Sequence, residues 1–391
     1  MMINRREAVV TGIAALTTPC RAASPGPEES IALVERGGGA RGGELAALSI
    51  DLLMQKLGVP GMSMAVIRDW KIHWSKSYGV RDAASRVPVT PDTPFQAASI
   101  SKPVTAMAVL RLAQAGRLRL DDDVNAYLRH WTLKACAGCK GKPVTPRSLM
   151  GHVAGADDGF GFPGYPPSAP LPTIVDILDG RPPSVTGAVS FTRPPYETYK
   201  YSGGSYVVLQ QMLTDLTGRP FAELMRDLVL KPLAMESSTF EQPLPSKLTA
   251  LAAAAHSADG KRMDQPWHVY PEQSAAGLWT TAADLAAMVI DVQRAVRDDS
   301  GKVLRRQMAR EMLSPIGVGP FGAGFRLTAL GDGWYFYHGG SNWGFEAHVR
   351  GHLNKGYGVA IMTNAQESGA TLINEMGSRV AEVYAWDGAS K

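Results

Sequence analysis

Residues 97–108 read AASISKPVTAMA, where a short apolar run ends and an amphipathic helix is predicted to begin. Ser99 and Lys102 are three residues apart, and side chains at this spacing are neighbours on one helix face. The positive end of the helix dipole lies at the same place, where it disfavours an ammonium and favours a developing oxyanion. It therefore helps to keep Lys102 neutral enough to accept a proton from the Ser99 hydroxyl. A Ser-x-x-Lys also arises by chance about once in a chain of this size, so the interpretation of Ser99 as a nucleophile depends on partners elsewhere.

The composition is that of a globular protein with ample material for a buried core. The chain has 391 residues, of which 45% are hydrophobic and 19% charged, enough for one large domain or two of ordinary size. Its net charge of +4 comes from 40 basic and 36 acidic residues spread along the sequence. Because the chain has no basic block and no interleaving of basic and aromatic residues, we expect no nucleic-acid partner.

The N-terminal residues have the layout of a cleavable export signal. Arg5 and Arg6 precede an uncharged apolar stretch at 8–16, and small residues follow at 22–24. The stretch is too short to span a bilayer as a mature helix, and the arginine pair resembles a twin-arginine signal. We therefore expect residues 1–24 to be removed and the mature chain to be periplasmic or extracellular, without a stable membrane span.

Two cysteines of the expected mature chain, Cys136 and Cys139, form a single C-x-x-C motif. One such pair without a second pair or a nearby histidine is a poor zinc site. Outside the cytoplasm disulfides persist, so a local disulfide is the favoured interpretation and a redox-active pair is the alternative. The eight histidines show no H-E-x-x-H pattern, and we expect neither a metal nor a cofactor.

Strand-like segments lie near the two ends of the chain, with helical patterns between them. The simplest packing is one antiparallel sheet flanked by helices, joined to a mostly helical second domain, so we predict an α+β fold with Ser99 at the domain boundary. The predicted parts are a linker at 25–43, a sheet domain from 44–98 and 231–391, and a helical domain at 99–230. The predicted strands are 61–67, 71–78, 322–327, 333–337, 344–350 and 357–363, and the predicted helices include 44–57 and 372–386.

A tyrosine in the middle of the chain is a candidate partner of Ser99. Residues 199–206 read YKYSGGSY, so Tyr201 precedes a glycine-bearing tight turn and a predicted helix. A phenol of lowered pKa close to a lysine amine could move a proton between the nucleophile and a leaving group. The alternative is that Tyr201 serves only packing.

A glycine pair near the C-terminus is a second candidate. Residues 337–344 read YHGGSNWG, at the end of a predicted strand. Gly339 and Gly340 let a substrate approach the backbone closely, and the N–H groups beyond them can point into a cleft. An oxyanion needs two donors at about 3 Å, and the amides of Ser341 and Ser99 could be that pair. The alternative is an ordinary Gly-Gly hairpin turn.

An aromatic loop completes the candidate site residues. Residues 159–166 read GFGFPGYP, with Phe160, Phe162 and Tyr165 among them. A surface loop with this many aromatic residues is either fixed in a core or lines an apolar pocket.

Taken together, Ser99-x-x-Lys102, Tyr201-Ser202-Gly203 and His338-Gly339-Gly340 resemble the three motifs of the serine β-lactamase-related hydrolases. That superfamily contains class C β-lactamases, D-alanyl-D-alanine carboxypeptidases, D-aminopeptidases and family VIII esterases. The resemblance covers nearly all of the expected mature chain. A competing enzyme class, the α/β-hydrolases, needs a G-x-S-x-G pentapeptide, which this sequence lacks.

The resemblance implies a β-lactamase or penicillin-binding-protein-like fold and a role for each motif. Ser99 is implied to be acylated, with Lys102 as its base or proton relay and Tyr201 as general base and acid. The amides of Ser99 and Ser341 are implied to form the oxyanion hole. The reaction implied is attack on an ester or amide carbonyl of a small molecule or peptide, followed by hydrolysis of the acyl-enzyme.

Two departures from the family pattern bear on the substrate. Gly203 stands where class C β-lactamases have an asparagine that helps to hold the substrate amide and the lysine. His338 replaces the usual lysine, so a largely neutral imidazole stands where a cation faces a carboxylate. Both changes favour an esterase, or a hydrolase of uncharged acyl or D-amino acid substrates, over efficient β-lactam hydrolysis, with the aromatic loop as an apolar acyl or alcohol pocket. The alternatives are a β-lactamase, a DD-peptidase or D-aminopeptidase, and an acylated sensor that does not turn over.

Overall fold

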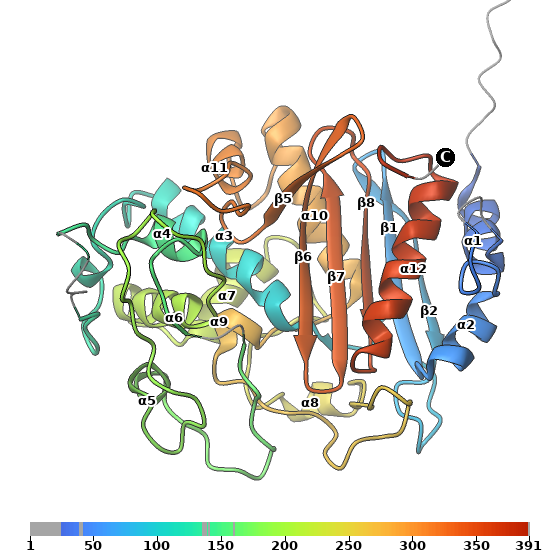
Figure 1. Cartoon of the computed structure of the whole chain (residues 1–391), viewed down its shortest axis with the longest axis horizontal. Coiled ribbons are helices and arrows are strands. Elements are labelled where there is room, and N and C mark those ends of the chain that lie inside the picture. Colours follow the sequence, from blue (N-terminus) through green and yellow to red (C-terminus); the bar gives the residue numbers. More distant parts are fainter. Residues whose placement is uncertain (1–24, 39–41, 135–138, 140, 159–160, 390–391) are drawn as a thin grey trace, which may run out of the picture.

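The structure is a computed structural model that describes residues 25–38, 42–134, 139, 141–158 and 161–389. The predicted export signal lies outside these residues. Within them, no helix is both long and apolar enough to cross a membrane. A central sheet, a layer of helices on each of its faces and a mostly helical region beside it make up the fold (Figure 1).

The sheet has six strands in the order β2-β1-β8-β7-β6-β5, and every neighbouring pair is antiparallel. It therefore joins segments from the two ends of the chain, as predicted. The strands are β1 (Gly61–Arg68), β2 (Lys71–Gly79), β5 (Arg326–Leu330), β6 (Gly333–Asn342), β7 (Phe345–His352) and β8 (Gly358–Thr363). A second, two-stranded sheet pairs β3 (Phe95–Gln96) with β4 (Trp279–Thr280), and β3 lies just before Ser99 in the sequence.

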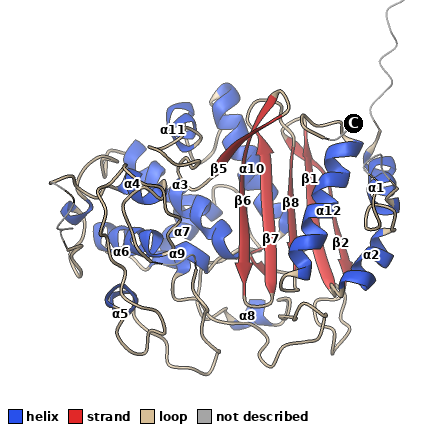
Figure 2. Ribbon diagram, viewed as in Figure 1, coloured by secondary structure: helices blue, strands red, loops and turns tan. Residues whose placement is uncertain are grey.

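Helices lie on both faces of the six-stranded sheet (Figure 2), and each face has its own hydrophobic core. Side chains alternate between the faces of a strand. In β1, Met64 and Val66 therefore pack under α12 (Ser368–Val383), α1 (Pro27–Arg36) and α2 (Ile50–Leu57). Ala65 and Ile67 face the opposite core, which is shared with α10 and the helical region. The sheet thus links the two halves of the fold.

The helical region follows Ser99 along the chain. Its longest members are α3 (Ser101–Gln114) and α6 (Gly204–Thr217), both deeply buried on most of their surface. The remaining helices of the described chain, including α10 on the sheet, are η1 (Ala98–Ile100), η2 (Val124–Ala126), α4 (Pro146–Met150), α5 (Ile174–Asp179), α7 (Phe221–Met225), the π-helix η3 (Arg226–Leu230), α8 (Ser246–Thr249), α9 (Gln273–Ala276), α10 (Ala282–Asp298) and α11 (Arg306–Met312).

Several predicted boundaries differ from the structure. The helix predicted at 44–57 begins only at Ile50, because the Ser49 hydroxyl caps it by accepting from the Leu52 N–H at 3.5 Å. The strand predicted at 322–327 begins at Arg326, because Gly324 has a φ of +84° and lies against the backbone of Pro103. The strand predicted at 333–337 continues to Asn342 along β7.

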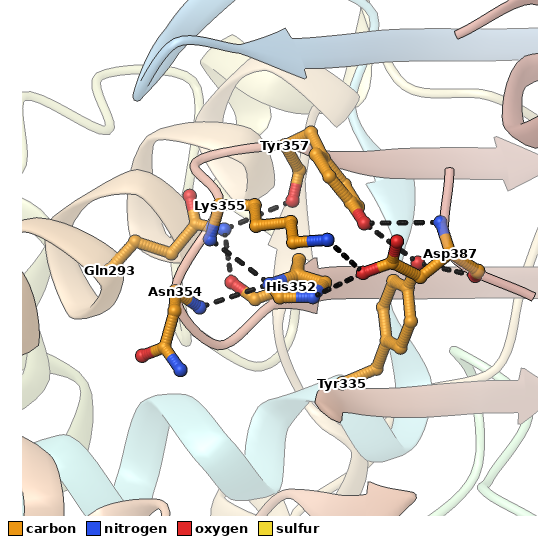
Figure 3. Close-up of polar contacts among 7 residues, drawn as sticks. All are labelled: Gln293, Tyr335, His352, Asn354, Lys355, Tyr357 and Asp387. Carbon is orange, nitrogen blue, oxygen red and sulfur yellow. Dashed lines mark hydrogen bonds and ion pairs between the residues drawn. The ribbon is translucent and has the colours of Figure 1, made fainter. Parts of the chain in front are cut away.

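The C-terminal segment after α12 is tied to the end of the sheet by a polar cluster (Figure 3). The His352 ring accepts the N–H groups of Asn354 and Lys355 at Nδ1, both at 3.0 Å, and faces Asp387 Oδ2 with Nε2 at 3.2 Å. Because Nδ1 accepts, Nε2 carries the proton and donates to the carboxylate. The Tyr335 hydroxyl donates to the Asp387 carbonyl at 2.7 Å. The cluster lies at the end of the β6–β7 pair opposite to Asn342 and Phe345.

Candidate active site

Ser99 lies in a turn rather than in the helix that follows it. It is the middle residue of the 3-10 turn η1, and α3 begins two residues later at Ser101. The preceding residue, Ala98, has a φ of +48°, which is uncommon for a residue with a side chain. The Ser101 hydroxyl holds the turn by donating to the Ala98 carbonyl at 2.6 Å. The prediction that Ser99 and Lys102 share one helix face is therefore wrong in that Ser99 precedes α3, and a strained backbone presents its hydroxyl.

Lys102 reaches Ser99 from the first turn of α3. Its Nζ lies 3.0 Å from Ser99 Oγ and donates to the Ala275 carbonyl at 2.8 Å. The side chain is only 1% exposed, and this burial lowers the pKa of Lys102 to about 7, with Asp158 acting in the opposite direction. The neutral amine expected from the sequence is thus supported, but its main cause is burial and not the helix dipole.

Tyr201 joins the same cluster from the segment before α6. Its ring lies 5.1 Å from Lys102 Nζ, and its phenol shares a hydrogen bond with Ser99. Burial raises the pKa of Tyr201 well above its ordinary value, so the phenol holds its proton. The expectation of a lowered pKa is therefore wrong, because loss of solvent outweighs the hydrogen bond from Ser99.

His152 contacts Tyr201 and both of its neighbours in the sequence. Its carbonyl accepts the N–H of Lys200 at 3.0 Å, and its Nδ1 accepts the N–H of Ser202 at 3.2 Å. Its ring stacks on Tyr201 with the centroids 4.3 Å apart. Burial, Lys102 and His338 lower the pKa of His152, which keeps the ring neutral. The sequence analysis missed His152, since its contacts join positions about fifty residues apart.

Asp158 is a second residue that the sequence analysis missed. Its carboxylate accepts the Ser202 hydroxyl at 2.5 Å and the Gly204 N–H, at the start of α6, at 2.7 Å. A carboxylate is stabilised at the N-terminus of a helix. Asp158 thereby fixes the residues that follow Tyr201 in sequence.

The glycine motif lies inside β6, so the hairpin-turn alternative is wrong. The pairing of β6 with β5 ends at Tyr337, whereas the pairing with β7 continues to Asn342. The edge of β6 from His338 to Asn342 is therefore open on the side of η1, which it contacts. A Cβ on Gly340 would lie 2.2 Å from the Ala97 carbonyl oxygen, so only glycine allows this approach. The oxyanion hole formed by the Ser99 and Ser341 amides stays a prediction that this placement favours.

His338 is buried beside Tyr201, with ring centroids 6.0 Å apart. Its Nδ1 lies 2.5 Å from the Gly339 carbonyl oxygen. Because a carbonyl only accepts, Nδ1 carries the proton and Nε2 has a free lone pair. Burial, with Lys102 adding to it, lowers the pKa of His338 to about 3. The neutral imidazole expected from the sequence is supported.

Ser99, Tyr201 and His338 lie on a cleft of about 580 Å³ between the sheet and the helical region. It is lined by Ser99, Gly161, Tyr199, Tyr201, Phe321, Arg326, Tyr337, His338, Gly339, Gly340, Ser341, Glu346, Ala347, His348, Ala370, Ile373 and Asn374. The sequence analysis did not identify the aromatic and α12 side chains of this lining.

The aromatic loop is placed differently from the predicted pocket. Gly161 lines the cleft, but Phe162 packs on Gly203, where an added Cβ would lie 2.8 Å from its ring. Tyr165 is buried, and its hydroxyl accepts the Val185 N–H at 3.3 Å. Phe160 lies outside the described residues. A substrate-binding role for these three residues stays a prediction, and the structure favours fixation in a core for Tyr165.

Cys139 is disulfide-bonded. Its predicted partner, Cys136, lies outside the described residues, and the pairing stays a prediction. In the part of the chain that the structure describes, no group of three or more His, Cys, Asp or Glu side chains is placed to hold a metal ion.

The Beta-lactamase family model matches residues 48–376, which include all three motifs. The chain belongs to the Beta-lactamase family. Among curated relatives, protein flp of Staphylococcus aureus strain MW2 is 24% identical over 323 residues, which cover 80% of this chain and 61% of flp. Penicillin-binding protein 4 of Amycolatopsis lactamdurans is 26% identical over 359 residues, or 86% of this chain and 91% of the relative. The chain thus spans about three fifths of the length of the flp proteins that it matches.

Solved structures show the same fold. The β-lactamase/D-alanine carboxypeptidase of Yersinia pestis superposes with a TM-score of 0.68 at 20% identity, covering 91% of this chain and 98% of that one. The octameric penicillin-binding protein homologue of Pyrococcus abyssi gives 0.65 at 22% identity, with 86% and 76% covered. The predicted fold class and the predicted superfamily are confirmed by these matches and by the family model.

Proposed function

We propose that this Beta-lactamase family member is a serine hydrolase that cleaves ester or amide substrates through an acyl-enzyme at Ser99, with esters preferred. The observation that carries the proposal is the 3.0 Å contact between Ser99 Oγ and Lys102 Nζ. The pKa of about 7 leaves a large fraction of Lys102 as the free amine at neutral pH. Such an amine can accept the proton of the serine hydroxyl as the oxygen attacks.

The proton route follows from the ionisation states. Ser99 gives its proton to Lys102 while its oxygen bonds to the carbonyl carbon, and the resulting oxyanion is held by the Ser99 and Ser341 amides. Because the Tyr201 phenol is protonated, it donates to the departing group and regains a proton from the Lys102 ammonium. Water then cleaves the acyl-enzyme, with the same groups activating it, and free Ser99 is restored.

Two features support esters as the preferred substrates. Phe162 rather than a polar side chain lies against Gly203, so this wall offers no amide group to a substrate. The neutral His338 supplies no positive charge for a carboxylate. The relatives named as β-lactamase, carboxypeptidase or penicillin-binding protein keep β-lactam or D-peptide hydrolysis as the alternative within the family. Export of the mature chain to the periplasm or medium belongs to the same proposal.

The test combines covalent labelling with a substrate panel. A fluorophosphonate probe and peptide mass spectrometry should mark Ser99, and Ser99→Ala should abolish labelling. Short acyl p-nitrophenyl esters should turn over faster than nitrocefin and D-Ala-D-Ala peptides. Labelling at another residue would overturn the assignment of the nucleophile. A single burst equal to the enzyme concentration, with no turnover on any substrate, would instead indicate an acylated sensor.

A further inference from the structure

The walls of the cleft carry little positive charge. Burial lowers the pKa of His338 to about 3 and that of His348 to about 4, so both lining histidines are neutral at pH 7. Lys102 is buried and engaged with Ser99 and the Ala275 carbonyl. Among the described lining residues, Arg326 is the one with a permanent positive charge, and it is exposed on β5.

His338 lines the cleft and carries a hydrogen-bond acceptor that has no partner among the described residues. The N–H at Nδ1 donates to the Gly339 carbonyl, and Nε2 is buried with no hydrogen-bond partner in the described part of the chain. Because buried polar atoms in native proteins nearly always have a partner, the unpaired Nε2 requires an explanation. A neutral imidazole nitrogen with a lone pair can be satisfied only by an N–H or O–H donor.

Glu346 offers a second acceptor on the same cleft. It is 9% exposed, and both of its hydrogen bonds, from the Ser341 hydroxyl at 2.9 Å and the Glu367 N–H at 3.3 Å, go to Oε1. Burial raises the pKa of Glu346, and these two hydrogen bonds lower it. In the described chain Glu346 has no ion pair, although buried carboxylates are rarely left unpaired.

The Glu346 carboxylate lies beside the N-terminal end of α12. The Glu367 N–H that it accepts stands immediately before α12, where the partial positive charge of the helix N-terminus favours a carboxylate. Burial is the largest influence on the pKa of Glu346 and raises it, and the neighbouring Glu367 raises it further. Because both hydrogen bonds go to Oε1, Oε2 remains available to a donor that enters the cleft.

We propose that His338 Nε2 and the Glu346 carboxylate form an acceptor wall that selects acyl substrates bearing a hydrogen-bond donor, an ammonium group above all, and rejects carboxylates. The proposal rests on the proposed hydrolase function, because it concerns the substrate of the same cleft. A purely apolar pocket would select acyl groups by length, whereas the acceptor wall predicts that kcat/KM depends on the charge of acyl groups of equal length.

The test compares three p-nitrophenyl esters of matched chain length: 6-aminohexanoyl, heptanoyl and the monoester of adipic acid. For the whole protein, kcat/KM should be about tenfold higher for the ammonium ester than for heptanoyl and about tenfold lower for the carboxylate ester. Added salt should reduce both differences. Glu346→Gln keeps an acceptor for Ser341 but removes the charge, and it should bring the three values within about threefold.

A matched control is Glu236→Gln, which removes a carboxylate that lines a separate cavity elsewhere on the molecule and should leave the ratios unchanged. Circular dichroism establishes that each variant is folded. Equal kcat/KM for the three esters in the unmodified protein, or ratios unaltered in folded Glu346→Gln, would refute the acceptor wall. A preference for the adipic ester that Arg326→Gln removes would show that Arg326 reads a carboxylate instead. Absence of turnover on all three esters would count against the proposed hydrolase function, and this outcome differs from the equal kcat/KM values that would refute the acceptor wall alone.

Discussion

The His152 imidazole lies nearly flat on the Tyr201 ring, with the centroids 4.3 Å apart and the planes inclined by 29°. His152 also binds the backbone on both sides of Tyr201, through its carbonyl to Lys200 and through Nδ1 to Ser202. Its backbone has a φ of +59°, so the arrangement is maintained at some conformational cost. These contacts make His152 a positioning residue for the phenol.

We therefore expect His152→Phe to lower kcat about 10- to 100-fold with little change in KM, because the stack survives while the Ser202 N–H loses its acceptor. Tyr201→Phe should keep the fold and lose several orders of magnitude in kcat. If His152 acts only through Tyr201, the double variant should be no slower than Tyr201→Phe alone. Multiplying losses in the double variant would show that His152 has a separate role.

The two glycines of the third motif should differ sharply when replaced. An added Cβ on Gly340 would lie 2.2 Å from the Ala97 oxygen, whereas on Gly339 the nearest atom is the Ala347 oxygen at 3.9 Å. Gly340→Ala must push β6 away from Ala97 and η1, so we expect the rate at which fluorophosphonate labels Ser99 to fall at least about 100-fold. Gly339→Ala should melt within a few degrees of the unmodified protein. Equal labelling of Gly340→Ala and the unmodified protein would contradict the close approach.

The pH dependence of acylation follows from Lys102. Burial lowers its pKa to about 7, so the amine is an ammonium without a lone pair below this pH and a competent base above it. For the neutral heptanoyl ester, kcat/KM should therefore rise as the pH increases from 6 to 8 and then level off. His338 does not titrate in this window, because its pKa is about 3.

One other group must be separated from Lys102. Glu272 is fully buried just before α9, and burial raises the pKa of its carboxyl to about 7 as well. Glu272→Gln removes this titration, so a profile that keeps its midpoint in the folded variant assigns the rise to Lys102. A profile that becomes flat would assign it to Glu272.

The sequence predicted most of the framework because its signals are local. The predicted strands 61–67 and 71–78 agree with β1 and β2 to within one residue, and alternate side chains of β1 lie in the two cores. Of the candidate site, only the three sequence motifs could be predicted; the contacts that other elements make with them could not. The pKa of Tyr201 was predicted in the wrong direction, because burial depends on how α6, β6 and η1 pack together. His152, Asp158 and Glu346 were missed for the same reason: each acts on a motif from another element.

The cluster at the C-terminal end of the sheet predicts a loss of stability remote from the cleft. Asp387 accepts from His352 and Lys355, and its backbone binds the Tyr335 and Tyr357 hydroxyls (Figure 3). Asp387→Ala leaves the nearly buried His352 ring without an acceptor, so we expect the free energy of unfolding to fall by about 1–3 kcal/mol in urea denaturation. Lys355→Ala breaks a more exposed pair that solvent screens, so it should cost clearly less than Asp387→Ala. Equal losses would mean that the ion pair, and not the histidine, is stabilised by Asp387.

The contact between Phe162 and Gly203 gives a prediction about the second motif. The Phe162 ring occupies the space that a side chain at position 203 would need, with Cε2 2.8 Å and Cζ 3.4 Å from an added Cβ. Gly203→Asn should therefore destabilise the protein by about 1–3 kcal/mol through overpacking, and Phe162→Ala should relieve most of that loss in the double variant.

The same double variant tests whether the Gly203–Phe162 contact contributes to the proposed preference for esters. It places an amide side chain in the second motif, at the start of α6 and two residues after Tyr201. We expect its kcat/KM ratio of nitrocefin to heptanoyl ester to rise at least about tenfold over that of Phe162→Ala, because a buried hydrogen bond to the substrate amide becomes available. An unchanged ratio in a folded double variant would mean that the Gly203–Phe162 contact stabilises the loop without contributing to substrate choice.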